Sequence, residues 1–138
     1  MDLTGFTFTD GDSTDSLQPF QGGGSLVPAG GFAVIVDADY TTGLYAIPPG
    51  TTLMTTLDTT LGNGLATDDT VALFAPGIAD AISSYGTPTD TADAVPITTA
   101  PTGKSVERGD PTAPDAAGNW CISMAASGST PGAPNAGC

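Results

Sequence analysis

The sequence contains almost no positive charge. Lys104 and Arg108 are its only cations, against 15 acidic side chains and no histidine, so the formal net charge is −13. Two cations are too few to supply the phosphate contacts that drive nucleic-acid binding, or a basic patch for anionic lipid. Without histidine the chain also has no imidazole ligand for a metal and no ready proton shuttle at neutral pH. We therefore expect no nucleic-acid partner and no histidine-based site.

Long apolar segments are missing as well. No run approaches the roughly 18 apolar residues of a membrane span, so we expect no membrane insertion. Residues 1–20 lack both the cation and the apolar core of a signal peptide. The 138 residues fit one domain, 1–138. We expect this domain to be a fragment of a longer exported protein whose signal peptide lies outside it.

Large apolar side chains are scarce, and the composition favours strands over helices. Leu, Ile, Val and Phe together number 26 of 138 residues, whereas Thr, which suits pleated strands, numbers 22. Short apolar clusters alternate with turn residues, and no segment keeps a helical period. This pattern predicts an all-β sandwich or small barrel. Compact β chains poor in lysine are typical of secreted proteins, so we expect an extracellular or cell-surface location.

Eight segments carry the features of strands. Residues 32–36 are continuously apolar, which predicts a central strand buried on both faces, and residues 10–28 are predicted to form a loop. Trp120, Ile122 and Met124 alternate with polar neighbours and are expected to share a core-facing side. The predicted strands are residues 3–9, 32–36, 44–47, 51–57, 71–74, 78–85, 104–108 and 120–124.

Two cysteines, Cys121 and Cys138, predict one disulfide in an exported chain. The strand alternation places Cys121 opposite the core-facing side, where the C-terminal tail could reach it. The bridge would close an 18-residue loop, worth roughly 3 kcal/mol in the chain-entropy model. The alternative is a pair of free thiols. Two thiolates without histidine make a poor zinc site.

Several motifs occur in a distinctive order toward the C-terminus. They are Gly-Lys-Ser-Val-Glu-Arg at 103–108, Asn-Trp at 119–120 and Ser-Thr-Pro-Gly-Ala-Pro-Asn at 129–135. With residues 2–10 and 26–36 before them, these motifs resemble the lamin-tail domain of intermediate filaments, in the form found in secreted bacterial proteins. Residues 61–73 and 80–86 also look like segments of this family. The positions that match its signature are Gly103, Ser105, Arg108, Trp120, Thr130, Pro131, Gly132 and Asn135.

The resemblance implies an immunoglobulin-like β-sandwich of about seven to eight short antiparallel strands. It implies a non-catalytic interaction or attachment module of a secreted or cell-surface bacterial protein, with an unknown protein or surface ligand as partner. The signature residues are expected to be structural. Arg108 would pair with a carboxylate and hydrogen-bond to loop carbonyls, and Trp120 would lie in the core. Residues 130–132 fit a type II turn, with Pro131 at its second position and Gly132 at its third.

The family usually opens with two further strands before the motif that residues 2–10 resemble. Nothing of that kind precedes Leu3 in this sequence. A sandwich without these strands exposes a sheet edge and an apolar face. We therefore expect an exposed apolar surface where these two strands would pack, through which the chain could self-associate.

An acidic turn is the candidate metal site. Asp10, Asp12 and Asp15 place three carboxylates within six residues, and such hard oxygen ligands suit Ca²⁺. Asp37 and Asp39, after the apolar run, could join them. No glutamate follows at the twelfth position, so this is not an EF-hand, and a solvated acidic turn is the alternative interpretation. A calcium-dependent acidic surface module is thus a second functional hypothesis, with no other cofactor expected.

No catalytic constellation is evident, and we expect that the chain is not an enzyme. Lys104 and Ser105 are adjacent, so on a strand they point to opposite faces and would not act together. The 14 aspartates make accidental carboxylate pairs common, whereas the single Glu107 offers few candidates for an acid of raised pKa. A third hypothesis is an accessory domain of an exported hydrolase whose catalytic part lies outside this segment.

Overall fold

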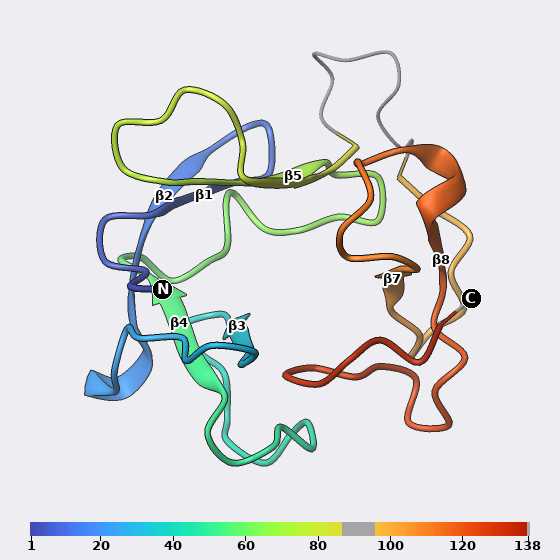
Figure 1. The fold of residues 1–138 in the computed structure, drawn as a ribbon, viewed down its shortest axis with the longest axis horizontal. Helices are drawn as coiled ribbons and strands as arrows, with labels where there is room; N and C mark the ends of the chain where they lie inside the picture. The colour runs from blue at the N-terminus through green and yellow to red at the C-terminus, as the bar shows by residue number, and fades with distance from the viewer. Residues whose placement is uncertain (87–95, 138) are drawn as a thin grey trace.

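The structure, a computed structural model, describes residues 1–86 and 96–137, and short strands dominate it (Figure 1). Two single-turn 3-10 segments, η1 and η2, are the helical elements of this part of the chain. The elements in chain order are β1 (Thr7–Thr9), β2 (Thr14–Pro19), η1 (Phe20–Gly22), β3 (Ala33–Ile35), β4 (Thr52–Thr56), β5 (Val71–Phe74), β6 (Ser83–Tyr85), β7 (Val106–Arg108), η2 (Ala117–Asn119) and β8 (Trp120–Ile122).

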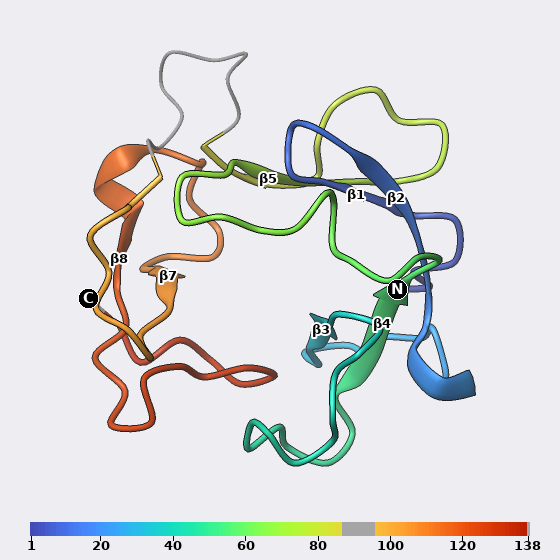
Figure 2. The same ribbon diagram turned by 180° about the vertical axis from the view of Figure 1, so that it is seen from behind.

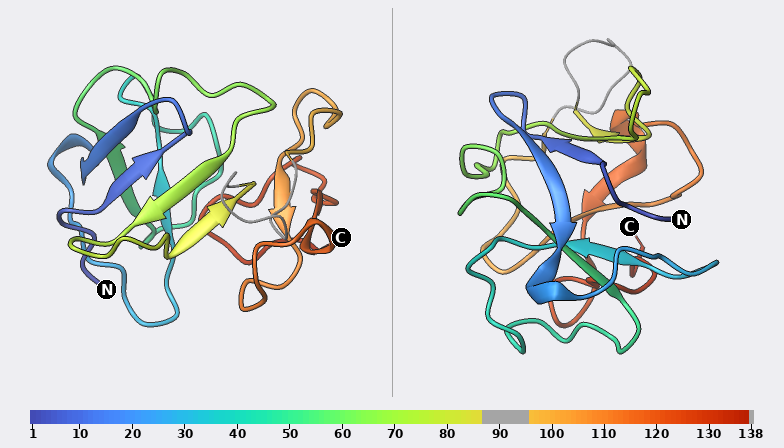
Figure 3. Two further views of the ribbon diagram at one scale, coloured as in Figure 1. Left: turned by 90° about the horizontal axis from the view of Figure 1, so that it is seen from above. Right: turned by 90° about the vertical axis from the view of Figure 1, so that its left-hand side faces the viewer.

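Six strands form one curled sheet in the order β3-β4-β2-β1-β5-β6 (Figure 3). Its centre is the β1–β2 hairpin, in which Phe8 lies opposite Asp15, and β1 also pairs with β5 so that Phe8 lies opposite Leu73. These pairings are antiparallel. The β3–β4 pair is parallel and places Ile35 opposite Met54.

The hydrophobic core lies inside the curl of this sheet. Phe6 and Phe8 are buried while Thr7 and Thr9 are half-buried, which confirms the alternation expected for the first strand. Met54 is fully buried. The buried members of the core are Leu3, Phe6, Phe8, Leu17 and Met54, and Val27, Ile35, Leu61, Val71, Leu73 and Ala75 pack against them.

Strands β7 and β8 form a separate antiparallel pair. Its register sets Glu107 opposite Cys121 and Arg108 opposite Trp120, so each pair of residues shares one face. Figures 1 and 2 show this pair on the side of the molecule away from β2 and β4, with the C-terminal tail looping back toward β4. The two sheets confirm the predicted all-β, sandwich-like class, and the parallel β3–β4 pair is its one departure from antiparallel pairing in the described residues.

The strand expected to be central is an edge strand. β3 stands at the end of the sheet order and pairs with β4 alone. Ala33 is exposed and Phe32 is 39% exposed, so the apolar run at residues 32–36 is not buried on both faces. A continuous apolar run does not distinguish a central strand from an edge strand that is only half covered.

Strand β2 is the element that the sequence did not predict, since residues 10–28 were expected to be a loop. Its inward positions are Asp15 and Leu17, and the carboxylate at one of them interrupts the apolar alternation. Conversely, residues 44–47 were predicted as a strand and form a loop. Met124 is 71% exposed because β8 ends at Ile122, so the core-facing alternation does not extend to it.

The N-terminal segment lies beside an exposed apolar surface. The Met1 amino group donates to the Val27 carbonyl oxygen at 2.6 Å, and Asp2 forms an isolated bridge with Leu26. Met1 is 65% exposed and Leu26 is 68% exposed. Self-association through these exposed apolar side chains stays a prediction. In the described part of the chain, no helix has the length and apolarity needed to cross a bilayer.

Candidate functional site

The first candidate, the acidic turn, is held by its own backbone. Asp10 is only 4% exposed. One of its carboxylate oxygens accepts hydrogen bonds from the amides of Asp12 (3.1 Å) and Ser13 (2.8 Å), and the other accepts from the amide of Asn63 (2.8 Å). Burial by itself raises the pKa of Asp10, but these backbone hydrogen bonds outweigh it, and the pKa lies below its ordinary value. The carboxylate thus ties the β1–β2 turn to the loop after β4.

The remaining carboxylates of the turn do not converge with Asp10 on one point. Asp15 is 8% exposed and accepts a hydrogen bond from the Gly62 amide at 2.7 Å, while Asp12 is exposed and reaches only the Asn63 side-chain amide, at 3.4 Å. Within residues 1–86 and 96–137, no three carboxylate or thiolate side chains form a group that could hold a metal ion. The structure therefore does not assemble the predicted calcium ligands.

Asp37 and Asp39, the other predicted acidic pair, form a turn of their own. An Asp37 carboxylate oxygen accepts from the Asp39 amide at 3.0 Å, and the Asp37 carbonyl oxygen accepts from the Tyr40 amide at 3.0 Å. This is the local turn that an aspartate side chain favours. The pair thus directs the chain after β3 into the loop that carries Tyr40.

Side chains on one face of strand β7 connect the two sheets. Arg108 donates from Nη2 to the Ser84 carbonyl oxygen of β6 at 2.7 Å, and its guanidinium lies 4.9 Å from the centroid of the Trp120 ring. The Trp120 ring is 4.4 Å from that of Tyr85, centroid to centroid. Asp115 accepts from Trp120 Nε1 at 2.7 Å and from Ser84 Oγ at 2.9 Å. Arg108 bonds to a backbone carbonyl as expected, but to one in a strand and not in a loop, and the expected carboxylate partner is not found among the described residues. Trp120 was expected in the core, but it is half-buried and lies outside the hydrophobic core cluster.

The opposite face holds the C-terminal tail. Glu107 is 4% exposed and accepts from Thr130 Oγ1 at 2.9 Å and from the Ala136 amide at 3.0 Å. Burial by itself raises the pKa of Glu107, but the hydrogen bonds to its carboxylate lower the pKa by more, so the pKa lies below its ordinary value. Cys121 shares this face and is disulfide-bonded. Cys138, the other cysteine of the sequence, lies outside the described residues.

The closing turn of the tail is the predicted type II turn. The Ala133 amide donates to the Thr130 carbonyl oxygen at 3.1 Å, and Gly132 has a φ of +74°. A Cβ at Gly132 would lie 2.5 Å from Thr51 Oγ1, so this turn approaches the start of β4 at a distance that only glycine permits. Together with the Asn135 side chain, which donates to the Arg108 carbonyl oxygen at 2.7 Å, the turn has the structural role expected of the signature.

Two further signature residues, Gly103 and Ser105, also contact the C-terminal tail. Ser105 donates its amide to the Gly128 carbonyl oxygen at 2.9 Å and accepts at its own carbonyl from the Ser123 amide at 2.9 Å. Gly103 has a φ of +83°, and the Gly103 carbonyl oxygen fills the space where a side chain at Gly128 would start. These residues therefore bring two backbone segments into close contact.

A surface aromatic cluster was not predicted from the sequence. The rings of Tyr40 and Tyr45 are almost parallel, with an interplanar angle of 8° and centroids 6.2 Å apart. The buried Phe20 packs against Tyr40, with the ring centroids 5.7 Å apart and the ring planes at 57°. Tyr45 is 51% exposed. We call the segment 37–47 that presents the two tyrosines the tyrosine loop.

The tyrosine loop is a succession of hydrogen-bonded turns. After the turn at Asp37, the Leu44 amide donates to the Thr41 carbonyl oxygen at 3.2 Å and the Ile47 amide donates to the Tyr45 carbonyl oxygen at 3.0 Å. Turns of this kind fix the backbone locally, so the two rings are held in place before any contact with a partner.

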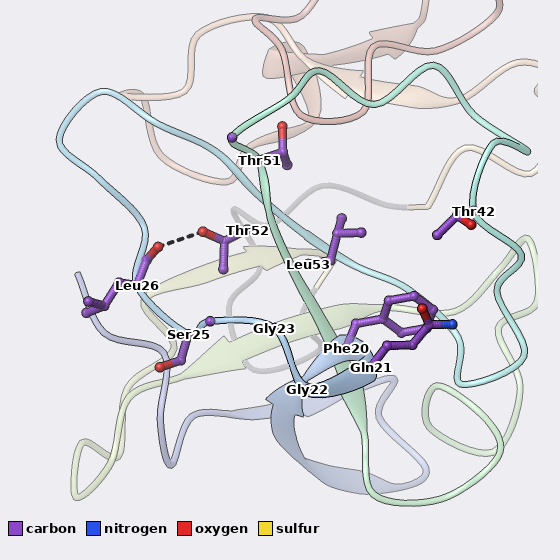
Figure 4. Close-up of a pocket in the computed structure, with 12 residues that line it drawn as sticks. Phe20, Gln21, Gly22, Gly23, Ser25, Leu26, Thr42, Thr51, Thr52 and Leu53 are labelled. Atoms are coloured by element: carbon purple, nitrogen blue, oxygen red, sulfur yellow. Dashed lines mark hydrogen bonds between the residues drawn. The ribbon is translucent and has the colours of Figure 1, made fainter.

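A groove lies between the tyrosine loop, the η1 turn and the start of β4 (Figure 4). It has a volume of about 700 Å³. Its wall combines apolar side chains with hydroxyls, one carboxamide and several glycines. The lining residues are Phe20, Gln21, Gly22, Gly23, Gly24, Ser25, Leu26, Thr42, Gly50, Thr51, Thr52 and Leu53.

Gln21 presents its side chain in this groove from an unusual backbone conformation. Its φ of 50° and ψ of 34° lie in the left-handed region, where it is the one residue other than glycine among those the structure describes. Such a conformation costs about 1 kcal/mol or more for a residue with a Cβ. Figure 4 shows Gln21 beside the Phe20 ring, so the turn places an amide group next to an aromatic support.

A second, smaller hollow is lined by other residues of the same loop. It has a volume of about 310 Å³ and joins the tyrosine loop to the closing turn of the tail. Its lining residues are Leu44, Tyr45, Ala46, Ser127, Ser129, Thr130, Pro131 and Ala133. The tyrosine loop therefore contributes to two hollows, since Thr42 lines the first and Tyr45 lines the second.

Sequence reasoning missed this surface because its parts come from segments far apart in the chain. One signal was available: two of the three tyrosines stand within six residues of each other, in a stretch rich in turn residues. An aromatic pair in a loop has no core strand to bury it. Comparison with known proteins does not supply a name for the site, because no family model, no curated protein and no solved structure matches this chain.

Proposed function

We propose that this chain is a non-catalytic binding module that attaches a secreted or cell-surface bacterial protein to its target. The observation that carries the proposal is the pair of near-parallel tyrosine rings, 6.2 Å apart, held on a turn-rich loop beside the groove. Rings of this kind are apolar on their faces and polar at the hydroxyl, and they are common at recognition surfaces. The binding surface is the tyrosine loop together with the groove.

The roles of the buried acidic side chains support a binding role rather than acid–base chemistry. Asp10, Asp15 and Glu107 each accept hydrogen bonds from backbone amides or a hydroxyl that link separate segments. The pKa of Asp10 and that of Glu107 both lie below their ordinary values, whereas a general acid needs a raised pKa. These carboxylates stabilise the scaffold that presents the loop.

The disulfide supports the proposal that the protein is exported. Cys121 is disulfide-bonded, and disulfides persist mainly in oxidising compartments outside the cytoplasm. The resemblance to lamin-tail modules of secreted bacterial proteins agrees with this location.

The experiment is a binding assay on intact bacterial cells, isolated cell envelopes and purified polysaccharides, with the labelled chain and its Tyr40→Ala/Tyr45→Ala variant. We expect the chain to bind at least one of these surfaces and the variant to lose most of that binding. Equal binding by the two proteins, or no binding to any surface, would refute the proposal. Ile78→Ala removes an apolar side chain that is 54% exposed and outside both hollows, so it controls for nonspecific adhesion.

A further inference from the structure

The charge of the two hollows differs from that of the whole chain. The net charge is −13, with 14 aspartates spread through the sequence. None of the described residues that line either hollow is acidic or basic. The hollows are therefore neutral surfaces on a strongly acidic protein, and this contrast restricts what can bind there.

Anionic ligands are disfavoured by the charge of the protein. A net charge of −13 generates a negative potential around the molecule that repels phosphates, uronic acids and nucleic acids at physiological ionic strength. Cationic peptides would be attracted to the protein as a whole. Among the residues that line the hollows, however, a lysine or arginine side chain would lose water without gaining a carboxylate partner, which is unfavourable. Asp37 and Asp39 lie at the start of the tyrosine loop, outside the lining of both hollows. A neutral ligand avoids both costs.

The groups in the groove match a ligand rich in hydroxyls. Thr42 offers a hydroxyl that both donates and accepts, and Gln21 offers a carboxamide with two donors and an acceptor. Ser25 Oγ accepts from Thr4 Oγ1 at 3.2 Å and Thr51 Oγ1 donates to the Gly132 carbonyl oxygen at 3.5 Å, so each keeps part of its hydrogen-bonding capacity for a ligand. Thr52 is already committed, because its hydroxyl donates to the Leu26 carbonyl oxygen at 2.7 Å (Figure 4). A binding site that combines apolar surface with a few convergent polar groups of this type fixes the orientation of a small polar unit.

The tyrosine pair adds a flat apolar surface beside these groups. A pyranose ring is apolar on the faces that carry its axial C–H bonds, and such C–H groups interact favourably with the face of an aromatic ring. The rings of Tyr40 and Tyr45 are stacked on each other and Tyr45 is 51% exposed, so Tyr45 presents the accessible aromatic surface of the stack to a sugar ring. Residues of the loop line both hollows, so an extended polymer that follows the loop can contact both of them.

We infer that the tyrosine loop and its two hollows bind a neutral, linear polysaccharide. This inference rests on the proposed function and specifies the ligand of the same surface. Tyr40 and Tyr45 supply the stacking surface, and Gln21 supplies hydrogen bonds to sugar hydroxyls from the groove. The left-handed backbone at Gln21 is then the cost of placing that amide beside the Phe20–Tyr40 aromatic pair.

Affinity electrophoresis tests the inference on the intact chain, because a protein with a charge of −13 migrates readily in a native gel. The gels contain hydroxyethyl cellulose, laminarin, soluble starch, xylan or galactomannan, with polygalacturonate as the anionic comparison. We expect retardation by at least one neutral polysaccharide and none by polygalacturonate. Tyr40→Ala and Tyr45→Ala should each weaken the affinity about tenfold, and Gln21→Ala should weaken it severalfold.

Two controls separate binding from folding. The Ile78→Ala protein should be retarded as strongly as the unaltered chain, and every variant should keep the melting temperature of the parent within a few degrees. Gln21→Gly removes the amide while relieving the backbone strain. It should therefore melt no lower than the parent and still bind more weakly, which a purely structural role for Gln21 would not produce.

The outcomes also separate this inference from the proposed function. If the chain binds cells or cell envelopes through its tyrosines but no neutral polysaccharide, the binding role stands and the polysaccharide is excluded. If polygalacturonate retards the chain as strongly as the neutral polymers do, the charge argument is wrong and the inference fails. If nothing binds in any assay, both the proposed function and the inference fail.

Discussion

Glu107 accepts a hydrogen bond from Thr130 at 2.9 Å, and this contact links the only glutamate of the chain to its closing turn. The second carboxylate oxygen accepts from the Ala136 amide at 3.0 Å. Glu107→Gln keeps the shape of the side chain but places an amide NH2 group, itself a donor, where one of these hydrogen-bond donors points. We expect it to lower the free energy of unfolding by about 1–3 kcal/mol in urea titrations. Asp68→Asn, at an exposed position, is the matched control and should have little effect.

Stability should fall on acidification through the two buried carboxylates. The pKa values of Asp10 and Glu107 in the folded chain lie below their ordinary values of 3.8 and 4.5. As the pH falls, these carboxyl groups therefore take up protons in the unfolded chain before they do so in the folded chain. Their contribution to the free energy of unfolding is complete above about pH 5, and it is lost as the pH falls below 4.5 and through the lowered pKa values of the folded chain. Melting temperatures measured from pH 7 to pH 2 should show this decline. The decline should be shallower in Glu107→Gln, and an unchanged slope would contradict the assignment.

Gly62 should be intolerant of any side chain. It has a φ of +60°, and a Cβ there would overlap the Asp10 carboxylate. Gly62→Ala therefore combines the cost of a left-handed alanine, about 1 kcal/mol, with displacement of a buried carboxylate. We expect a total loss of more than about 2 kcal/mol in chemical unfolding. Gly30→Ala isolates the backbone cost, because Gly30 has a φ of +71° and open space around it. Equal losses in the two variants would show that the Asp10 contact is unimportant.

The sequence was informative wherever local chemistry decides the structure. The alternation of Phe6 and Phe8 predicted β1, and the Thr-Pro-Gly order at 130–132 predicted a type II turn that the structure confirms. Each feature depends on residues within one strand or one turn. Alternation of apolar and polar residues is sufficient to specify the strand, and a proline followed by a glycine, which can adopt a positive φ, is sufficient to specify the turn.

Features that depend on distant partners were not predictable. Strand β2 has Asp15 at an inward position, and that carboxylate is tolerated there because the Gly62 amide, 47 residues away, donates to it. The groove is formed by segments around Gln21, Thr42 and Thr51, none of which carries a motif of its own. A neutral site built from common residues leaves no local signal, so tertiary structure was needed to find it.

Calcium should leave the stability of the chain unchanged. In the described residues, Asp10, Asp12 and Asp15 do not form a group of three metal ligands, and backbone amides hold the Asp10 and Asp15 carboxylates in their present positions, so gathering calcium ligands would require the turn to rearrange. We expect the same melting temperature in 5 mM calcium chloride and in 5 mM EDTA. A ligand that binds only the folded state raises the melting temperature in proportion to its occupancy. A calcium-dependent rise of several degrees would therefore restore the calcium hypothesis.

Arg108 should resist replacement even by lysine. Its guanidinium donates to the Ser84 carbonyl oxygen at 2.7 Å while lying 4.9 Å from the centroid of the Trp120 ring, and a lysine ammonium cannot reproduce both contacts. We expect Arg108→Lys to cost about 1–2 kcal/mol and to alter the fluorescence of Trp120, the only tryptophan. Lys104→Arg is the reciprocal control, because the Lys104 ammonium donates to the Ala125 carbonyl oxygen at 2.8 Å, a contact that a guanidinium can also make. If both exchanges have equal effects, the guanidinium does not join the two sheets.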